Sequence, residues 1–120
     1  MLKASAAELL AHLPGPPSAA WPDGERFIAA LAHGTLTVEL YAPRGSDPQT
    51  PHDRDEVYFV IAGRGEFVLR GERTRCAAGD AMFVAAGDPH RFENFTDDFT
   101  AWVVFYGPKG GECHSGPLAG

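Results

Sequence analysis

Two histidines and one glutamate near the middle of the chain have side chains that suit a metal site. His52 and Glu56 stand four residues apart, and His90 follows at the start of a later apolar stretch. Two imidazoles and one carboxylate, which leave coordination positions open, fit a divalent transition metal ion such as Fe, Mn, Ni, Co or Zn. Isolated histidines are also common on surfaces and in cores, so the spacing alone leaves a metal-free polar cluster as the alternative.

The residues that follow His52 predict the strand that presents Glu56. Residues 56–62 are mostly β-branched and aromatic, and Gly63 follows them, which is the pattern of a strand that ends at a turn. The charged residues 53–55 are expected to form a solvated turn or bulge. Such a turn would let the side chain of His52 point toward Glu56.

Three further residues share a strand face with a candidate ligand and are therefore candidate pocket residues. Side chains alternate across a strand, so Tyr58 shares a face with Glu56, and Phe92 and Asn94 share a face with His90. Aromatic side chains on strands are equally typical of a core, and an asparagine can hold a turn instead. Both interpretations stay open for these residues.

The remaining pattern predicts an all-β fold. Short apolar or alternating segments recur at intervals of roughly 7–12 residues with turns between them, which is typical of antiparallel sandwiches and barrels. About eight or nine strands are expected. Besides 56–62, they cover residues 27–31, 35–42, 66–70, 73–76, 81–84, 90–95 and 99–106.

The length of 120 residues predicts a single domain. Ser5 and Glu8 form a capping-box pattern, which predicts a short helix over residues 6–12. The domain has three expected parts: a helix with a proline-rich lead-in (1–26), the strands (27–106), and a Gly- and Pro-rich tail (107–120).

Charge and cysteine content exclude several classes of function. The formal net charge is −6 and no run of Lys or Arg occurs, so we expect neither nucleic acid nor an anionic membrane as a partner. No stretch approaches the ~20 apolar residues of a membrane helix. Cys76 and Cys113 are far apart, which indicates a reducing, cytoplasmic setting without a disulfide framework. Cys113 and His114 are expected to be exposed tail residues and not ligands.

Two stretches of the chain resemble the two sequence motifs of the cupin superfamily. The first motif is G-x5-H-x-H-x3-E-x6-G, and its second histidine, glutamate and last glycine match His52, Glu56 and Gly63. The second motif is G-x5-P-x-G-x2-H-x3-N, and its matching residues are Gly79, Gly87, His90 and Asn94. Two motifs in this order and at this separation make the resemblance specific, although they cover only about forty residues.

The resemblance implies a fold and a ligand set. The fold is an antiparallel double-sheet jelly-roll barrel, here with a short N-terminal helix, and the implied metal ligands are His52, Glu56 and His90. The chain departs from the motifs at Thr50, which replaces the first histidine, and at Ala85, which replaces the proline. Three protein ligands still suffice for a metal with open positions. Thr50, its neighbour Gln49 or a water molecule can fill the gap.

Two functions from different classes follow from the resemblance. One is a metal-dependent oxygenase or isomerase that acts on a small organic molecule. The other is a non-catalytic small-ligand-binding or sensor cupin with a degenerate metal site, which the substitution at Thr50 favours. Metal content of the purified protein distinguishes the two, and the sequence does not reveal the substrate.

We also expect a homodimer. Residues 57–61 and 99–106 are apolar on both strand faces, so both faces need to be covered, either inside a sandwich or at a subunit interface. Members of the resembled family commonly form dimers through their sheets.

Overall fold

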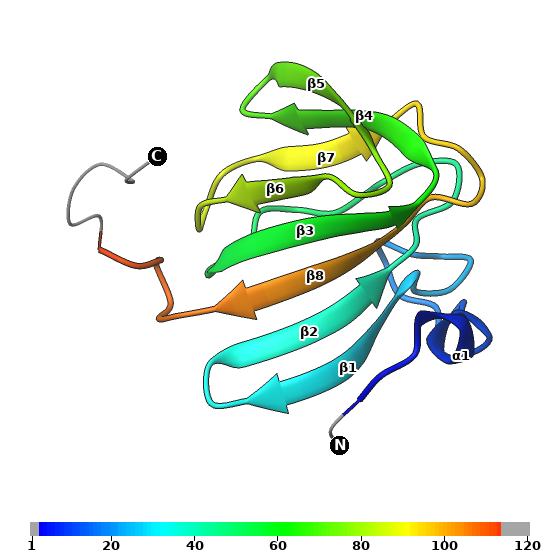
Figure 1. Cartoon of the computed structure of the whole chain (residues 1–120), viewed down its shortest axis with the longest axis horizontal. Coiled ribbons are helices and arrows are strands. Elements are labelled where there is room, and N and C mark those ends of the chain that lie inside the picture. Colours follow the sequence, from blue (N-terminus) through cyan, green and yellow to red (C-terminus); the bar gives the residue numbers. More distant parts are fainter. Residues whose placement is uncertain (1–2, 114–120) are drawn as a thin grey trace.

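Eight strands form two antiparallel sheets in the computed structural model, which describes residues 3–113 (Figure 1). The five-stranded sheet has the order β1 (Phe27–His33), β2 (Leu36–Tyr41), β8 (Thr100–Tyr106), β3 (Asp55–Ala62) and β6 (Ala81–Val84). The three-stranded sheet has the order β5 (Glu72–Ala77), β4 (Arg64–Leu69) and β7 (His90–Glu93). The predicted all-β fold is confirmed, with strand ends within a few residues of those expected.

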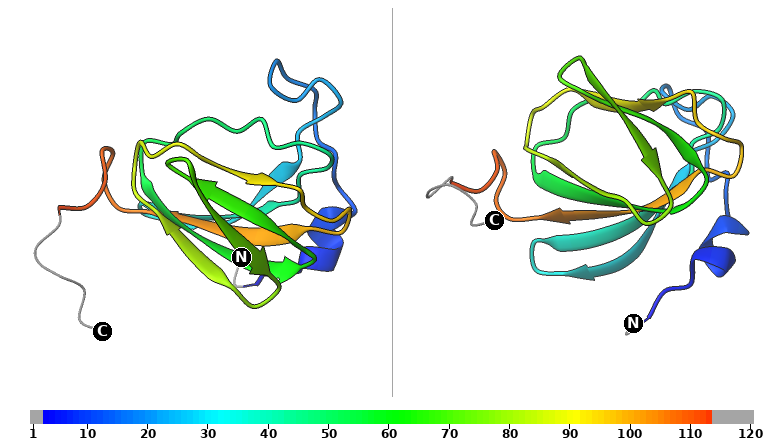
Figure 2. Two further views of the ribbon diagram at one scale, coloured as in Figure 1. Left: turned by 90° about the horizontal axis from the view of Figure 1, so that it is seen from above. Right: turned by 45° about the horizontal axis from the view of Figure 1, so that its top comes forward.

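The two sheets face each other and enclose the core (Figure 2). Among the described strands, no pairing joins one sheet to the other, so this jelly-roll arrangement is not a continuously hydrogen-bonded barrel. The chain passes from β3 to β4 at Gly63, which has a φ of 79°. A Cβ atom at this position would lie 2.9 Å from Cα of Phe99, so the corner between the sheets requires glycine.

One short helix precedes the strands. The helix α1 covers Ala6–Leu10, less than the predicted 6–12, and the side chain of Ser5 makes no capping hydrogen bond. The helix contacts β2, and Leu9 and Leu10 are half-buried. No helix in residues 3–113 combines the length and apolar character that a membrane span needs.

The register of the five-stranded sheet determines which side chains face the core. Glu39 on β2 pairs with Val103 on β8, which pairs with Tyr58 on β3. The next row on this inner face runs through Phe105 to Glu56. The inner face therefore carries two glutamates and a tyrosine, and these rows hold the candidate site.

The outer face of the same sheet is apolar. One row crosses all five strands, and Trp102 and Phe59 are paired in the row beside it. The members of the first row are Leu31, Val38, Val104, Val57 and Phe83. Leu40 also belongs to this face, and it is fully buried.

Candidate metal centre

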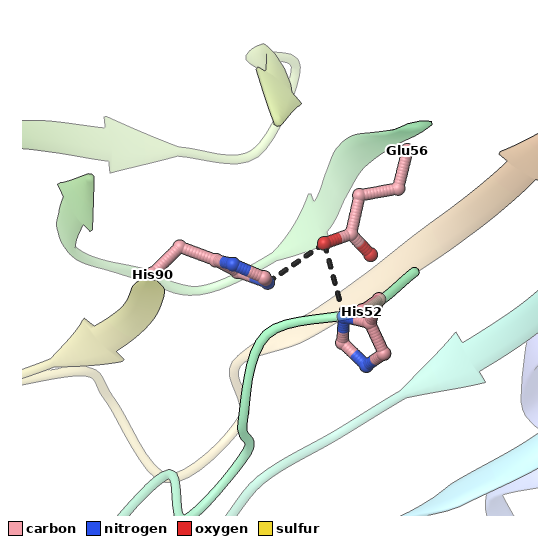
Figure 3. Close-up of side chains that lie close together, drawn as sticks. All are labelled: His52, Glu56 and His90. Carbon is pink, nitrogen blue, oxygen red and sulfur yellow. Dashed lines mark hydrogen bonds and ion pairs between the residues drawn. The ribbon is translucent and has the colours of Figure 1, made fainter. Parts of the chain in front are cut away.

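The three candidate ligands converge on one carboxylate oxygen (Figure 3). Glu56 Oε1 lies 2.7 Å from His90 Nε2 and 3.2 Å from His52 Nδ1. One possible ligand atom from each residue lies within 4.8 Å of the others. The side chains of Glu56 and His90 are completely buried, whereas that of His52 is 34% exposed, so the cluster is reached from the His52 side.

Each ligand is positioned by a different part of the fold. Glu56 is on β3 and His90 begins β7 in the opposite sheet, while His52 belongs to the loop before β3. His90 Nδ1–H donates a hydrogen bond to the carbonyl oxygen of Asp88 at 2.8 Å. A carbonyl only accepts, so this bond places a proton on Nδ1 and turns Nε2 toward the cluster.

The pKa values of the buried pair reflect their contact. Burial raises the pKa of Glu56, but the hydrogen bonds with His52 and His90 outweigh it, so the pKa lies below its ordinary value. Burial lowers the pKa of His90, but the contacts with Glu56 and the Asp88 carbonyl outweigh it, so that pKa is raised. The contact thus shifts both pKa values in the direction that favours the charged forms.

The donor set fits a metal ion. Oε2 of Glu56 is buried and has no hydrogen-bond partner among residues 3–113, so it is an available acceptor inside the cluster. Two imidazole nitrogens and carboxylate oxygen, with no thiolate among them, suit a divalent first-row ion.

A cavity of about 330 Å³ borders the exposed side of this cluster. His52, Tyr58, Gln49 and Thr50 line it, which places three of the five predicted pocket residues there. The Tyr58 hydroxyl donates to Gln49 Oε1 at 2.8 Å and lies 3.0 Å from His90 Nε2. Tyr58 therefore links the cavity wall to a candidate ligand.

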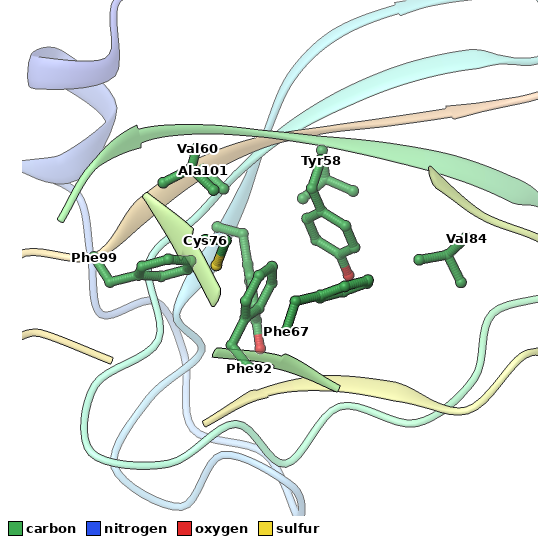
Figure 4. Packing of buried hydrophobic residues seen from close by; sticks show 10 residues of the cluster. Tyr58, Val60, Phe67, Cys76, Val84, Phe92, Phe99 and Ala101 are labelled. Atoms are coloured by element: carbon green, nitrogen blue, oxygen red, sulfur yellow. The ribbon is translucent and has the colours of Figure 1, made fainter. Parts of the chain in front are cut away.

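The other two predicted pocket residues lie elsewhere. Phe92 is buried in the core with its ring 5.0 Å from that of Tyr58 (Figure 4). Asn94 is exposed with a positive φ of 49°, and its Nδ2 donates to Glu66. The left-handed backbone ends the strand alternation that put Asn94 on the face of His90. Of the two interpretations left open for Asn94, the structure agrees with a residue that holds a turn.

Asp47 is a buried residue of the site that the sequence did not point to. Its carboxylate accepts hydrogen bonds from Gln49 Nε2 at 2.6 Å and from the Phe92 amide at 2.8 Å, as well as from the Tyr41 hydroxyl. Because a carboxylate only accepts, it orients the Gln49 amide so that Oε1 faces Tyr58. Asp47 lies in a loop without periodicity, where no pattern distinguishes it from solvated residues.

The expectation of a solvated turn over residues 53–55 is wrong for Asp55. Asp55 is 5% exposed and accepts hydrogen bonds from the backbone amides of Ala86 and Glu112, at 2.9 and 2.8 Å. It therefore joins the start of β3 to the loop before His90. Cys113 is exposed, as predicted, whereas His114 and the rest of the tail lie outside the described residues.

Comparison with known proteins assigns the family. The Cupin domain matches residues 37–106, and the chain belongs to the cupin family. An uncharacterized protein of Streptomyces coelicolor is 36% identical over 85 residues, which are 69% of this chain and 81% of the relative. The acireductone dioxygenase of Pseudomonas aeruginosa PAO1 is 32% identical over 119 aligned positions, which cover 78% of this chain and 66% of the enzyme.

A structural comparison agrees with the assignment. The crystal structure of the DMSP lyase DddQ from Ruegeria pomeroyi has a TM-score of 0.59 and 29% identity, and the match covers 69% of this chain and 48% of the lyase. KdgF from Halomonas has the same TM-score of 0.59 at 20% identity, which shows the shared fold. The chain therefore spans about half of the lyase structure.

Proposed function

We propose that the chain is a metal-dependent cupin enzyme, an oxygenase or isomerase that acts on a small organic molecule. His52, Glu56 and His90 would hold one divalent transition metal ion. The carrying observation is the convergence of these three side chains, with the unpartnered Glu56 Oε2 among them, beside a cavity of about 330 Å³. The similarity to an acireductone dioxygenase supports the oxygenase alternative.

The residues around the cluster have distinct tasks in this proposal. A bound ion would supply Lewis acidity or redox chemistry. His52, the exposed ligand, faces the cavity and marks the side from which a substrate approaches. The Tyr58 hydroxyl donates its hydrogen bond to Gln49 Oε1, so only the lone pairs of its oxygen are left to face His90. Thr50 lines the cavity and leaves room where the related motif has a ligand histidine.

Metal content tests the proposal directly. Purified protein is loaded separately with Fe(II), Mn, Ni, Co or Zn, and bound metal is measured after removal of the excess. We expect one ion per chain and its loss in His90→Ala. The matched control is His33→Ala, because His33 is an exposed histidine at the end of β1. Absence of bound metal at high added concentration would overturn both the assignment of the three ligands and the proposal that the chain is a metal-dependent enzyme.

One observation favours the second candidate function, a non-catalytic ligand-binding or sensor cupin. The imidazole of His90 and the carboxylate of Glu56 already satisfy each other at 2.7 Å, and Thr50 offers no imidazole. In this case the metal-free protein binds its ligand in the cavity and no turnover is seen with any metal. Oxygen consumption together with product formation from candidate small organic compounds distinguishes the two functions, since an isomerase changes its substrate without consuming oxygen.

The homodimer is also part of the proposal. Four large apolar side chains on the outer face of the five-stranded sheet are between 38% and 52% exposed, and they are Leu36, Phe59, Ile61 and Phe83. Exposed apolar surface of this kind marks contact sites, and a second copy of the sheet offers a matching surface. A cytoplasmic location, and the exclusion of nucleic acid and membrane partners, stay predictions from charge and cysteine content.

A further inference from the structure

Glu39 brings a second carboxylate to the cavity. The residue is on β2, where its side chain shares the inner face with Tyr41, and it lines the same cavity as His52. Glu39 and Tyr58 belong to one cross-strand row with Val103 between them. Two strand spacings place their Cα atoms roughly 10 Å apart. Glu39 is therefore on a different strand from Glu56, at the same cavity as His52.

The Glu39 carboxylate is half-buried and has no protein partner. Within residues 3–113 it makes no side-chain hydrogen bond and no ion pair. Burial raises its pKa, and the nearby Glu56 adds to this effect, while His52 opposes it. Among the described residues, no lysine or arginine lines the cavity. The Glu39 carboxylate therefore faces the cavity as an acceptor without a protein cation beside it, and a cationic ligand would supply the missing charge partner.

Aromatic rings form much of the remaining wall. Trp21, Phe27, Tyr41 and Phe105 line the cavity together with Glu39. The ring of Trp21 stands 6.1 Å from Phe27 and 6.0 Å from Tyr41, at interplanar angles of 66° and 84°. The Trp21 ring is thus tilted or nearly perpendicular to the other two, so it does not stack on them and the planes differ in direction. Aromatic faces attract cations, most strongly those that shed their water easily.

We propose that this cavity binds a small organic molecule that carries an alkylated ammonium group, with the cation held between Glu39 and the aromatic rings. An alkylated cation needs few hydrogen-bond acceptors, which suits a wall whose polar groups are few. The other end of the ligand faces His52 and the metal cluster. This inference names a substrate class for the proposed function. Binding of the cation is independent of that function, and only the orientation of the other end of the ligand toward His52 rests on it.

The binding test uses metal-free protein, so that it is independent of the metal site. Choline and its neutral isostere 3,3-dimethylbutan-1-ol are titrated into the chelator-treated chain, and affinities are measured by calorimetry. In a Trp102→Phe background, Trp21 is the single tryptophan and its fluorescence reports occupancy. We expect choline to bind roughly tenfold more tightly than the isostere and to change the emission of Trp21.

Two variants decide whether Glu39 recognises the charge. Glu39→Gln is expected to remove most of the difference between choline and the neutral isostere. The matched control is Glu72→Gln, because Glu72 is exposed on β5 in the other sheet. Equal affinities for both compounds, or preference for choline that survives in Glu39→Gln, would overturn the inference. Loss of metal binding with intact choline binding would instead refute only the proposed enzyme.

Discussion

The two faces of the five-stranded sheet differ most clearly on β3, where the inner face has buried polar side chains beside the buried Val60 and the outer face has exposed apolar ones. On β3, the inner residues Glu56 and Tyr58 are at most 1% exposed, although both are polar. The outer residues Phe59 and Ile61 are 43% and 39% exposed, although both are apolar. Adjacent residues on one strand therefore reverse the usual rule of burial.

The reversal separates two tasks. A buried polar face costs stability unless its groups are paired, and here the pairing partners are the histidines of the metal cluster. An exposed apolar face gives no benefit to an isolated chain in water, so its value lies in contact with another surface. We therefore propose that the inner face serves the candidate site and that the outer face contacts a second copy of the chain, a division that substitutions on either face can test.

The largest contrast is expected between Tyr58→Ala and Phe59→Ala. Tyr58 is 1% exposed in the core, so its truncation leaves a cavity and should lower the free energy of unfolding by about 3–5 kcal/mol. Phe59 is 43% exposed, so its truncation should cost under about 1 kcal/mol in the monomer. Urea unfolding at low protein concentration measures both values. Similar losses would contradict the division between the faces.

Replacement of the Glu56 carboxylate is expected to weaken metal binding on the inner face and to leave the outer face unchanged. Glu56→Gln keeps the shape of the side chain but removes the negative charge that both histidines contact. We expect metal affinity to fall by about 100-fold or more, since even outer-shell changes cost 10–100-fold. Competition with a chelator of known affinity measures the loss. Glu93→Gln is the control, because Glu93 makes its ion pairs with Arg73 and Arg91. An unchanged affinity would remove Glu56 from the ligand set.

A charge on the outer face should affect assembly alone. Phe59→Lys places an ammonium group in the hollow that Phe59 lines with Trp102 and Val38. We expect the dimer to dissociate at least about tenfold more readily, with unchanged metal content. Light scattering over a dilution series gives the dissociation constant. Thr74→Lys on the exposed strand β5 is the control. A wild-type chain that is already monomeric at micromolar concentration would refute the dimer.

The smallest expected effect concerns a single hydroxyl. Tyr58→Phe removes the donor to Gln49 Oε1 and leaves the ring in place. The loss of one buried hydrogen bond should lower the free energy of unfolding by about 1 kcal/mol. The metal stoichiometry should not change, because His52, Glu56 and His90 stay intact. Chemical unfolding and metal analysis test the two statements separately.

Strand alternation and the cupin motifs predicted the central features of the site. The spacing of His52 and Glu56 indicated a shared point, His90 was the second candidate imidazole, and the resemblance made the set of three specific. Alternation also placed Tyr58 on the face of Glu56, which the register shows. The structure brings these side chains together because each pattern depends on local geometry or on a specific motif, and their binding of a metal stays a prediction.

Other features lay beyond the reach of local patterns. Alternation on β2 divided Glu39 and Tyr41 from Val38 and Leu40, but it could not tell which face is inside. Here the inner face is the one with the glutamate, because the cavity and not the core receives it. Asp47 was missed because its partner Phe92 is 45 residues away, a contact that only the folded chain creates.

Two of the three candidate ligands lie on different sheets, and this affects the lifetime that the folded state would have with a metal bound. Glu56 is on β3 and His90 on β7, and no strand pairing among the described residues connects their sheets. An ion held by both would act as a cross-link across the sandwich. Because it binds only the folded chain, a thousandfold excess over its dissociation constant adds about 4 kcal/mol of stability. The supply of metal would then govern how long each molecule survives proteolysis.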